Sequence, residues 1–358
     1  MKVLFLTRSY FPNIGGVEKH VEKITEILMK KGHEVIILTE KPSMSYSNDY
    51  HSFSLSAKSI EKNRNPKIIR IEVGTENWFK KFRIWIQLIK YINVFSSSDI
   101  IHCHDVFFWY LPFRFIFPFK KVYTTFHGYE GNKIPNFKAI LMHKISEKLS
   151  NGNICIGDLL KKWYGTKPNY ISYGAVDSEL INLKNKAIDK DKNIIFAGRL
   201  EEETGILEYL KAIYLLKLKS INLSVDVYGE GQLKQKASEY VSKHKLKVKF
   251  KGFLPNVTDY IPEYKIIFVS RYLGILEALA LRVPIFAQYN NEIKKDYLYM
   301  APFAKYISIG KTGDDIANEV EKYINKQLLI DTDGGYEWVK DKTWENMVRI
   351  YLKLWKVD

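Results

Sequence analysis

Cysteine is scarce in this sequence: among 358 residues only Cys103 and Cys155 occur, each within a predicted strand. This excludes a disulfide-stabilised framework and a cysteine-based metal site, and it indicates reduced core residues of a cytoplasmic protein. No secretory signal peptide is expected either. The apolar run Val3–Leu6 is too short for one and is broken at Arg8.

Two nucleotide-binding fingerprints are also missing. The sequence contains neither the G-x-G-x-x-G dinucleotide motif nor a P-loop, which argues against dehydrogenases and NTPases. Zinc-finger spacing, an aromatic RNP pattern and a basic tail are absent as well, so no nucleic-acid partner is expected. Acidic residues are few, with 40 Asp and Glu against 55 Lys and Arg, a net charge of +15. This excess indicates either anionic partners or simply a lysine-rich surface.

The length and composition fit two α/β domains of ordinary size. The chain is too long for one common core, and its 46% hydrophobic and 27% charged residues are typical of a soluble globular protein. The first forty residues predict a β-α-β unit: a strand at 3–7, a glycine break, a helix with apolar residues at helical spacing, and a strand at 34–39. Further strands are predicted at 67–73, 99–104, 122–126 and 153–156.

A second alternation of strands and helices follows the charged segment 184–192. Its predicted strands are 194–197, 224–228, 248–250, 266–269, 284–287 and 306–309, and its predicted helices are 205–218, 232–245, 274–281 and 314–326. A last helix, at about 343–356, aligns Trp344, Val348, Tyr351 and Trp355 on one face. Such alternation predicts two Rossmann-like, doubly wound parallel sheets facing across a cleft.

We therefore predict one Rossmann-like domain at 1–183, a linker at 184–192, and a second Rossmann-like domain at 193–340. The C-terminal helix, 341–358, is long enough to return to the first domain, and packing against that domain is one option for it. A Ser-rich stretch, 43–56, is expected to be a surface loop, and Asp331-Thr-Asp333 is expected to be a turn and not a metal site.

Gly15-Gly16, between the first strand and the first helix, is a weak signal by itself. It permits close backbone approach to a ligand next to a helix N-terminus, which attracts anions, but it also suits a simple turn.

Several motifs in order make a stronger pattern. They are FPNIGGVEKHV (11–21), DIIHCHD (99–105), TTFHG (124–128), YGAVD (173–177), FAGRLEEETGI (196–206), VYGEG (227–231), KGFLP (251–255), SRYLGILEALALRVPI (270–285) and TWENMVRIYLKLW (343–355). Together they resemble glycosyltransferase family 4, whose members have the GT-B fold. The resemblance covers nearly the whole chain.

The resemblance implies roles for three residues. Arg199 is expected to contact the donor diphosphate, since a guanidinium suits phosphate oxygens. Glu277 is expected to hold the donor ribose, and His127 to act near the transferred sugar. The alternatives are a surface ion pair for Arg199, a first-turn glutamate stabilised by the helix dipole for Glu277, and a structural imidazole for His127.

The remaining site residues follow from the same resemblance. His102 and His104, two apart on one strand, share a face and are placed on the acceptor side; His20, on the first helix, is given no role, and no metal site is expected. The complete donor-binding set is Gly15, Gly16, Gly198, Arg199, Thr204, Phe253, Leu254, Arg271, Gly274, Ile275, Leu276 and Glu277.

The sequence departs from the family at two positions. Thr204 stands where a donor-loop lysine is usual, and Val269 stands where the first glutamate of the usual pair is expected. Our hypothesis is that Arg271 supplies part of the missing positive charge. The departure also leaves open a catalytically degenerate protein that serves as a partner subunit or sugar-nucleotide binder.

Two aromatic segments raise the question of whether the protein binds a membrane. Segment 78–92 predicts an amphipathic helix with Trp78, Phe82, Trp85, Ile89 and Ile92 on one face and basic residues on another, which suits either core packing or an anionic membrane surface. Segment 107–121 is strongly aromatic but too short to span a bilayer. The resemblance as a whole implies a retaining, metal-independent hexosyltransferase that uses a UDP- or GDP-linked sugar and a glycan or lipid-linked acceptor. It also implies that the domain 1–183 binds the acceptor and that the domain 193–340 binds the nucleotide sugar. Its expected location is the cytoplasm, including the inner face of the membrane.

Overall fold

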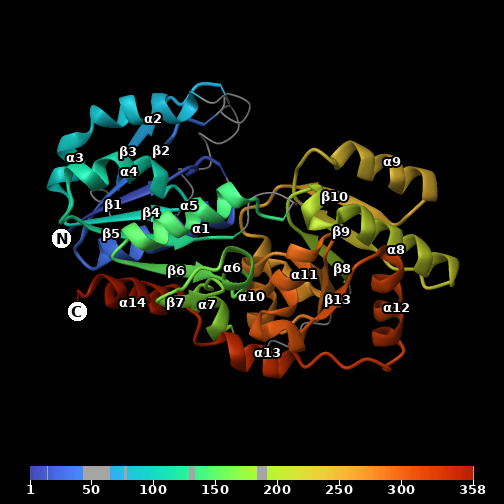
Figure 1. Ribbon diagram of the computed structural model, residues 1–358. Coiled ribbons are helices and arrows are strands. Elements are labelled where there is room, and N and C mark those ends of the chain that lie inside the picture. The colour runs from blue at the N-terminus through green and yellow to red at the C-terminus, as the bar shows by residue number, and fades with distance from the viewer. Residues whose placement is uncertain (14, 43–64, 76–78, 129–133, 184–191, 358) are drawn as a thin grey trace. The chain divides into compact units, whose positions relative to one another are not determined.

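The computed structural model describes all residues except 14, 43–64, 76–78, 129–133, 184–191 and 358. The predicted Ser-rich loop, Trp78 and nearly all of the predicted linker lie outside the described residues. The chain forms two compact units (Figure 1). Unit 1 comprises Met1–Tyr129, Pro135–Ser172 and Trp344–Asp358, and unit 2 comprises Glu130–Ile134 and Tyr173–Thr343. The units thus divide between Ser172 and Tyr173, ahead of the charged segment.

Unit 1 is built on a seven-stranded parallel sheet in the order β3-β2-β1-β4-β5-β6-β7. Its central strands β1, β4 and β5 are buried along almost their whole length, as expected for strands that are covered on both faces. The strands are β1 (Lys2–Thr7), β2 (Glu34–Glu40), β3 (Lys67–Ile71), β4 (Ile100–His104), β5 (Lys121–Phe126), β6 (Gly152–Ile156) and β7 (Tyr170–Ser172).

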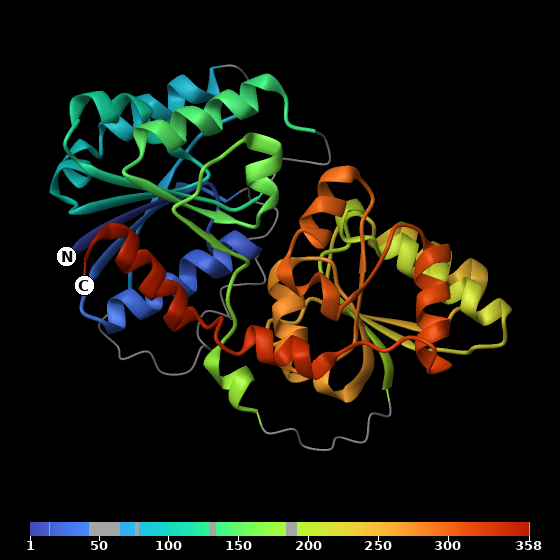
Figure 2. The same ribbon diagram turned by 60° about the horizontal axis from the view of Figure 1, so that its bottom comes forward.

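Helices cover both faces of this sheet (Figure 2). One face carries α2 (Lys80–Ile89), α3 (Ile92–Ser97), α4 (Phe107–Ile116) and α5 (Phe137–Leu149); the other carries α1 (Gly16–Lys30) and α14 (Trp344–Trp355). Two short helices come later in the chain: α6 (Leu159–Tyr164) follows β6 in unit 1, and α7 (Ser178–Asn182) follows β7 and belongs to unit 2. The four aromatic and aliphatic residues predicted to share one face of the last helix are all buried.

Unit 2 has a six-stranded parallel sheet in the order β10-β9-β8-β11-β12-β13. Its strands are β8 (Lys192–Ala197), β9 (Val225–Tyr228), β10 (Val248–Gly252), β11 (Tyr264–Phe268), β12 (Ile285–Gln288) and β13 (Ser308–Gly310). Its helices are α8 (Ile206–Leu218), α9 (Lys234–His244), α10 (Tyr272–Ala280), α11 (Glu292–Tyr299), α12 (Gly313–Ile324) and α13 (Thr332–Val339). Helices α8, α9 and α12 share one buried core with strands β8, β9, β11 and β12.

The predicted fold class is confirmed: both sheets are parallel and both alternate with helices. Cys103 and Cys155 are buried and free, as predicted. Two local predictions were wrong. Helix α10 begins at Tyr272, two residues before the predicted start, and Asp331 caps helix α13 by accepting a hydrogen bond from the Gly334 amide, so no simple turn lies there.

The predicted amphipathic helix is present as α2. One of its two expected roles was to pack its aromatic stripe on the core, but other residues of the helix face the core. Ile84 and Leu88 are buried, whereas Phe82, Ile86 and Ile89 are 49%, 62% and 57% exposed. The helix ends at Ile89, so Ile92 belongs to α3. Of the predicted stripe, Phe82 and Ile89 are therefore exposed, whereas Trp85 is half-buried and donates from its indole nitrogen to the carbonyl of Phe108. Within the described part of the chain, every helix is too short or too polar to traverse a bilayer.

Candidate functional site

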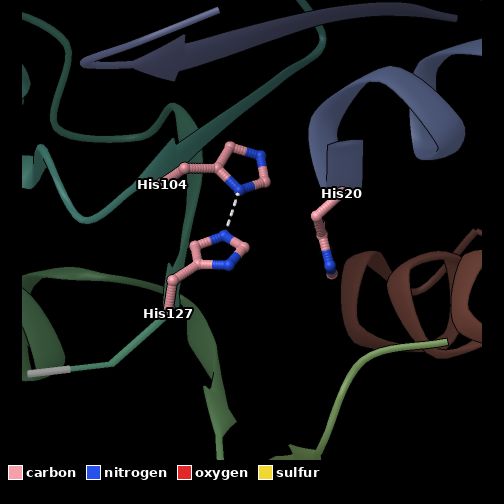
Figure 3. Close-up of side chains that lie close together, drawn as sticks. All are labelled: His20, His104 and His127. Atoms are coloured by element: carbon pink, nitrogen blue, oxygen red, sulfur yellow. Dashed lines mark hydrogen bonds between the residues drawn. The ribbon is translucent and has the colours of Figure 1, made fainter. Parts of the chain in front are cut away.

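Three imidazoles gather at the carboxyl ends of the central strands of unit 1 (Figure 3). His104 is the last residue of β4, His127 directly follows β5, and His20 lies on α1. Nδ1 of His104 and Nε2 of His127 are 2.8 Å apart in a hydrogen bond. The backbone amide of His127 donates to Asp105 Oδ1 at 2.9 Å, which fixes the start of the following loop. His127 is half-buried, so it retains access to solvent.

A buried hydrogen-bond chain connects this cluster to the C-terminal helix. The indole Nε1–H of Trp355 can only donate, so Nδ1 of His102 accepts it, at 3.0 Å. Neutral His102 therefore carries its proton on Nε2 and donates to Thr125 Oγ1 at 2.7 Å. The Thr125 proton is then available for Tyr351, 2.8 Å away, and the Tyr351 phenol proton for Nε2 of His20, also 2.8 Å away.

Burial keeps these imidazoles neutral. It lowers the pKa of His20 to about 3, because a charged ring would lose its hydration. Desolvation likewise lowers the pKa of His102, His104 and His127 well below the usual value. His102 has no exposed surface, and both of its ring nitrogens bond to protein side chains. Its place is in the core, behind His104.

The same cluster has the ligand number of a zinc site. One ring nitrogen from each of His20, His104 and His127 lies within 4.8 Å of the others. Three histidines with an open fourth position are one known catalytic zinc set. Nδ1 of His104 and Nε2 of His127 are engaged with each other, so a metal ion bound through these two nitrogens would have to open that hydrogen bond. Nε2 of His104 is buried and has no hydrogen-bond partner among the described residues.

In unit 2, the predicted donor loop follows β8. Gly229, after β9, has φ 153°, and a Cβ there would lie 1.8 Å from the carbonyl oxygen of Gly198. Only glycine permits this approach of the two loops. Thr204, at the position where the resemblance leads one to expect lysine, is buried, and its hydroxyl donates to the backbone carbonyl of Arg199 at 2.6 Å. Thr204 therefore holds the loop and brings no charge to it.

Two guanidinium groups meet at one carboxylate. Glu203 Oε1 lies 2.6 Å from Nη2 of Arg199 and also accepts from Nη2 of Arg271. Burial alone would raise the pKa of Glu203, but the charges of Arg271, Arg199 and Lys294 outweigh it and lower that pKa. The structure thus brings together Arg199 and Arg271, which the sequence assigned to one subsite. The bridging glutamate was not predicted.

Lys294 was also missed. It lies on α11, has no exposed surface, and donates from Nζ to the backbone carbonyl of Glu203. Burial, together with the neighbouring Arg271, lowers its pKa to about 7. In the sequence, the feature that could have indicated Lys294 is its position. It lies in the first turn of a helix whose polar cap, Asn291, follows the buried strand β12.

Helix α10 corrects part of the predicted phosphate cradle. Because the helix begins at Tyr272, the amide of Ile275 donates to the carbonyl of Arg271 at 2.9 Å and is not available to a ligand. By the same geometry Leu276 lies inside the helix, and only the first-turn amides up to Gly274 lack helical partners. Glu277 lies in the second turn and is 8% exposed. The helix dipole at a first turn therefore does not account for it.

The other predicted donor residues lie at scattered positions. Phe253 is partly exposed and Leu254 half-buried after β10, where the chain leaves the sheet. Gly15 and Gly16 belong to unit 1, where Gly15 caps α1 with extended backbone at φ −174°. This conformation suits any residue, so the glycine pair is not required by backbone geometry.

An exposed apolar face covers one side of unit 1. It consists of side chains at the start of and along α2, at the end of α4 and just after it, and on α5: Phe79, Phe82, Ile86, Ile89, Phe115, Ile116, Phe119, Phe137 and Leu141. Phe119 is 97% exposed. Helices α2, α3 and α4 contain no acidic residue, while Lys90, Lys121 and Lys138 are exposed nearby.

Sequence comparison matches both halves of the chain to known families. Residues 14–165 match the family described as Glycosyltransferase Family 4, and residues 177–332 match Glycosyl transferases group 1. One of the subunits of human phosphatidylinositol N-acetylglucosaminyltransferase is 24% identical over 185 residues. That alignment covers 50% of this chain and 35% of the relative, so the chain matches about a third of the relative's length.

Solved structures match along the whole chain. A glycosyltransferase from Rickettsia africae superposes with a TM-score of 0.71 at 16% identity, covering 99% of this chain and 97% of that one. Alr3699/HepE from Anabaena, in complex with UDP and glucose, superposes with a TM-score of 0.72 at 11% identity, covering 99% and 98%. At these identities the similarity establishes the shared fold.

Proposed function

Since this chain is a glycosyltransferase of the family 4 type with the GT-B fold, we propose that it moves a sugar from a nucleotide-diphosphate sugar to a lipid-linked acceptor, with retention of anomeric configuration. The observation that carries the proposal is the pair of guanidinium groups, Arg199 and Arg271, that share the carboxylate of Glu203. They follow β8 and β11, and ligands of open parallel sheets bind at the carboxyl ends of strands.

The pair suits a leaving diphosphate. Negative charge develops on the diphosphate as its bond to the sugar breaks, and fixed guanidinium groups stabilise that charge without reorganising. Glu277, nearly buried on α10, is proposed to accept hydrogen bonds from the donor ribose. No metal ion is required by this scheme, since arginine remains protonated at any relevant pH. UDP as the nucleotide is supported by its presence in the similar Anabaena protein.

His127 is proposed to contact the transferred sugar. Its ring is neutral, half-buried and fixed by His104, so it offers a hydrogen bond of defined direction. His104 is assigned to positioning His127, and to the acceptor side as predicted.

The acceptor is proposed to be a lipid at an anionic membrane, and the exposed apolar face of unit 1 to dock there at the inner side. Interfacial helices combine aromatic and aliphatic residues with basic ones, and α2, α3 and α4 carry no acidic residue. The name of the human relative, which belongs to a phosphatidylinositol N-acetylglucosaminyltransferase, supports a lipid acceptor.

Vesicle co-sedimentation tests the docking. The intact protein is expected to bind vesicles containing anionic lipid at low salt, and Ile86→Asp to reduce binding at least tenfold. Leu218→Asp, at a 64% exposed apolar residue of unit 2, is the matched control and should bind like the unchanged protein. Equal binding by both variants would remove the membrane from the proposal.

A panel of UDP- and GDP-sugars tests the reaction itself. Purified protein is incubated with each donor, and release of nucleotide diphosphate is followed with and without isolated lipid acceptors. Proton NMR of the product reports the anomeric configuration. Binding of a donor without release under any condition would instead support the degenerate, sugar-nucleotide-binding alternative.

A further inference from the structure

Lys294 has no part in the reaction proposed so far, yet its environment calls for an explanation. A lysine ammonium without solvent contact is costly to bury unless compensating groups surround it. Its one hydrogen bond given by the structure is to a neutral backbone carbonyl, that of Glu203. Asn291 fixes the backbone of Lys294 by accepting its amide proton at 2.8 Å. The side chain is therefore held in place at a position where an aliphatic residue would cost less.

Three cations converge on Glu203. Arg199 and Arg271 bind its carboxylate, and Lys294 binds its carbonyl. They come from the segments after β8, β11 and β12, which are neighbours in the sheet. One carboxylate carries a single negative charge, so with Lys294 protonated the cluster has an excess of two positive charges. A diphosphate carries more negative charge than a carboxylate and neutralises such a cluster better.

The position of Lys294 also matches the departure seen in the donor loop. Thr204 has no charge, and its hydroxyl is used to hold the loop. Lys294 contacts the residue directly before Thr204, because its Nζ donates to the carbonyl of Glu203. The positive charge that is missing at position 204 is thus supplied next to the loop by Lys294, which belongs to helix α11.

We propose that Arg199, Arg271 and Lys294 form one tricationic diphosphate site, and that the Glu203 carboxylate occupies it as an internal counter-ion until the donor displaces it. This inference rests on the proposed function and adds two residues to it. Glu203 competes with the diphosphate for both guanidinium groups, so donor binding includes the outward movement of its side chain. Lys294 then stabilises the bound diphosphate by charge and not by direct covalent chemistry.

Titration calorimetry on the full chain tests this, with UDP, GDP and inorganic pyrophosphate as probes and uridine as the ligand without phosphate. Glu203→Gln is expected to bind the best nucleoside diphosphate and pyrophosphate about tenfold more tightly, because the competitor is gone. Lys294→Met is expected to weaken both about tenfold or more, with uridine unaffected. Met fills a similar volume, and a thermal melt confirms that the variant is folded.

Matched controls lie next to each position. Glu202→Gln and Lys295→Met alter exposed neighbours with the same charges and should leave the affinities unchanged. If Glu203→Gln binds diphosphates no more tightly than the unchanged protein, the counter-ion role is wrong; if Lys294→Met binds equally well, the tricationic site is wrong. Pyrophosphate affinities that respond as expected, without binding of any nucleoside diphosphate, would support the site while overturning the proposed donor.

Discussion

The phenol oxygen of Tyr351 lies 2.8 Å from Nε2 of His20, and 331 positions of the chain separate the two residues. The same oxygen lies 2.8 Å from Thr125 Oγ1. Tyr351 therefore connects the C-terminal helix, the first helix and strand β5 through one buried group. A buried polar group that loses its partner retains the cost of its desolvation.

Tyr351→Phe tests the value of this connection. The change removes one oxygen and leaves His20 and Thr125 without their shared partner. We expect the free energy of unfolding to fall by about 1–3 kcal/mol, measured by urea denaturation followed by tryptophan fluorescence. Tyr299→Phe, at a half-exposed tyrosine of α11, is the control and should change little. An unaltered midpoint in Tyr351→Phe would show that the hydrogen-bond chain contributes nothing to stability.

Acid should destabilise unit 1 through its buried imidazoles. The folded pKa of His20 is about 3, below the ordinary value of 6.5, so between these pH values the unfolded chain binds a proton that the folded chain does not. The free energy of unfolding therefore has its full value above pH 6.5. It falls as the pH falls toward 3, by about 1.4 kcal/mol per pH unit for each such histidine. His102, His104 and His127 add to the effect.

Urea unfolding at pH 7.5, 6.5, 5.5 and 4.5 measures this slope. His20→Gln should lower it by about 1.4 kcal/mol per pH unit, whereas His244→Gln, on α9 in unit 2, removes a histidine outside the cluster. A slope that both variants leave alone would contradict the assignment.

Lys294→Met should stabilise the protein near neutral pH. The folded pKa of Lys294, about 7, lies below the ordinary 10.5, so between these values only the unfolded chain holds the proton. Stability of the unchanged protein therefore rises with pH across that window, and the charged form is most costly at pH 7 and below. We expect Lys294→Met to gain about 1–4 kcal/mol at pH 7 and to lose most of that advantage by pH 10.

The measurement is denaturant unfolding at pH 7, 8.5 and 10, with Lys295→Met as the exposed control, which should stay within about 0.5 kcal/mol. A destabilised Lys294→Met at pH 7 would mean that its contact with the Glu203 carbonyl outweighs the cost of burying the charge.

Removal of divalent metal ions should leave sugar transfer unchanged. In the proposed scheme the positive charges that stabilise the diphosphate come from Arg199 and Arg271, which share the carboxylate of Glu203. Activity is compared before and after dialysis against EDTA, with added Mg²⁺, Mn²⁺ or Zn²⁺ as separate conditions. A loss on dialysis that one of these ions restores would contradict the metal-independent scheme.

The fold was predictable because buried parallel strands appear in the sequence as uninterrupted apolar runs. Residues 3–6 and 35–38 are such runs, and the strands found there pair with each other inside the sheet. The edge strand Tyr170–Ser172 was missed, since three residues give no periodicity. Helix α2 was ambiguous for another reason: it is apolar on two faces, and only the sheet decides that Ile84 and Leu88 point inward.

The site was predictable in part. Arg199 and Arg271 were assigned together from separate motifs, and the structure joins them through Glu203. Glu203 and Lys294 lie in charged stretches that resemble an ordinary solvated surface, and the polar cap before Lys294 is shared by its exposed neighbour Lys295. The hydrogen bonds of Tyr351 and Trp355 depend on pairings across more than 200 residues, which no local pattern encodes.

Residues Tyr173–Thr343 stand between two parts of the chain that fold together, because α14 completes unit 1. During synthesis, all seven strands of unit 1 leave the ribosome before Tyr351 and Trp355 exist. The partners of His20, His102 and Thr125 on helix α14 are therefore synthesised only after the whole of unit 2. In the nascent first unit these polar groups are thus exposed to water, and they become buried only when helix α14 packs against the rest of unit 1.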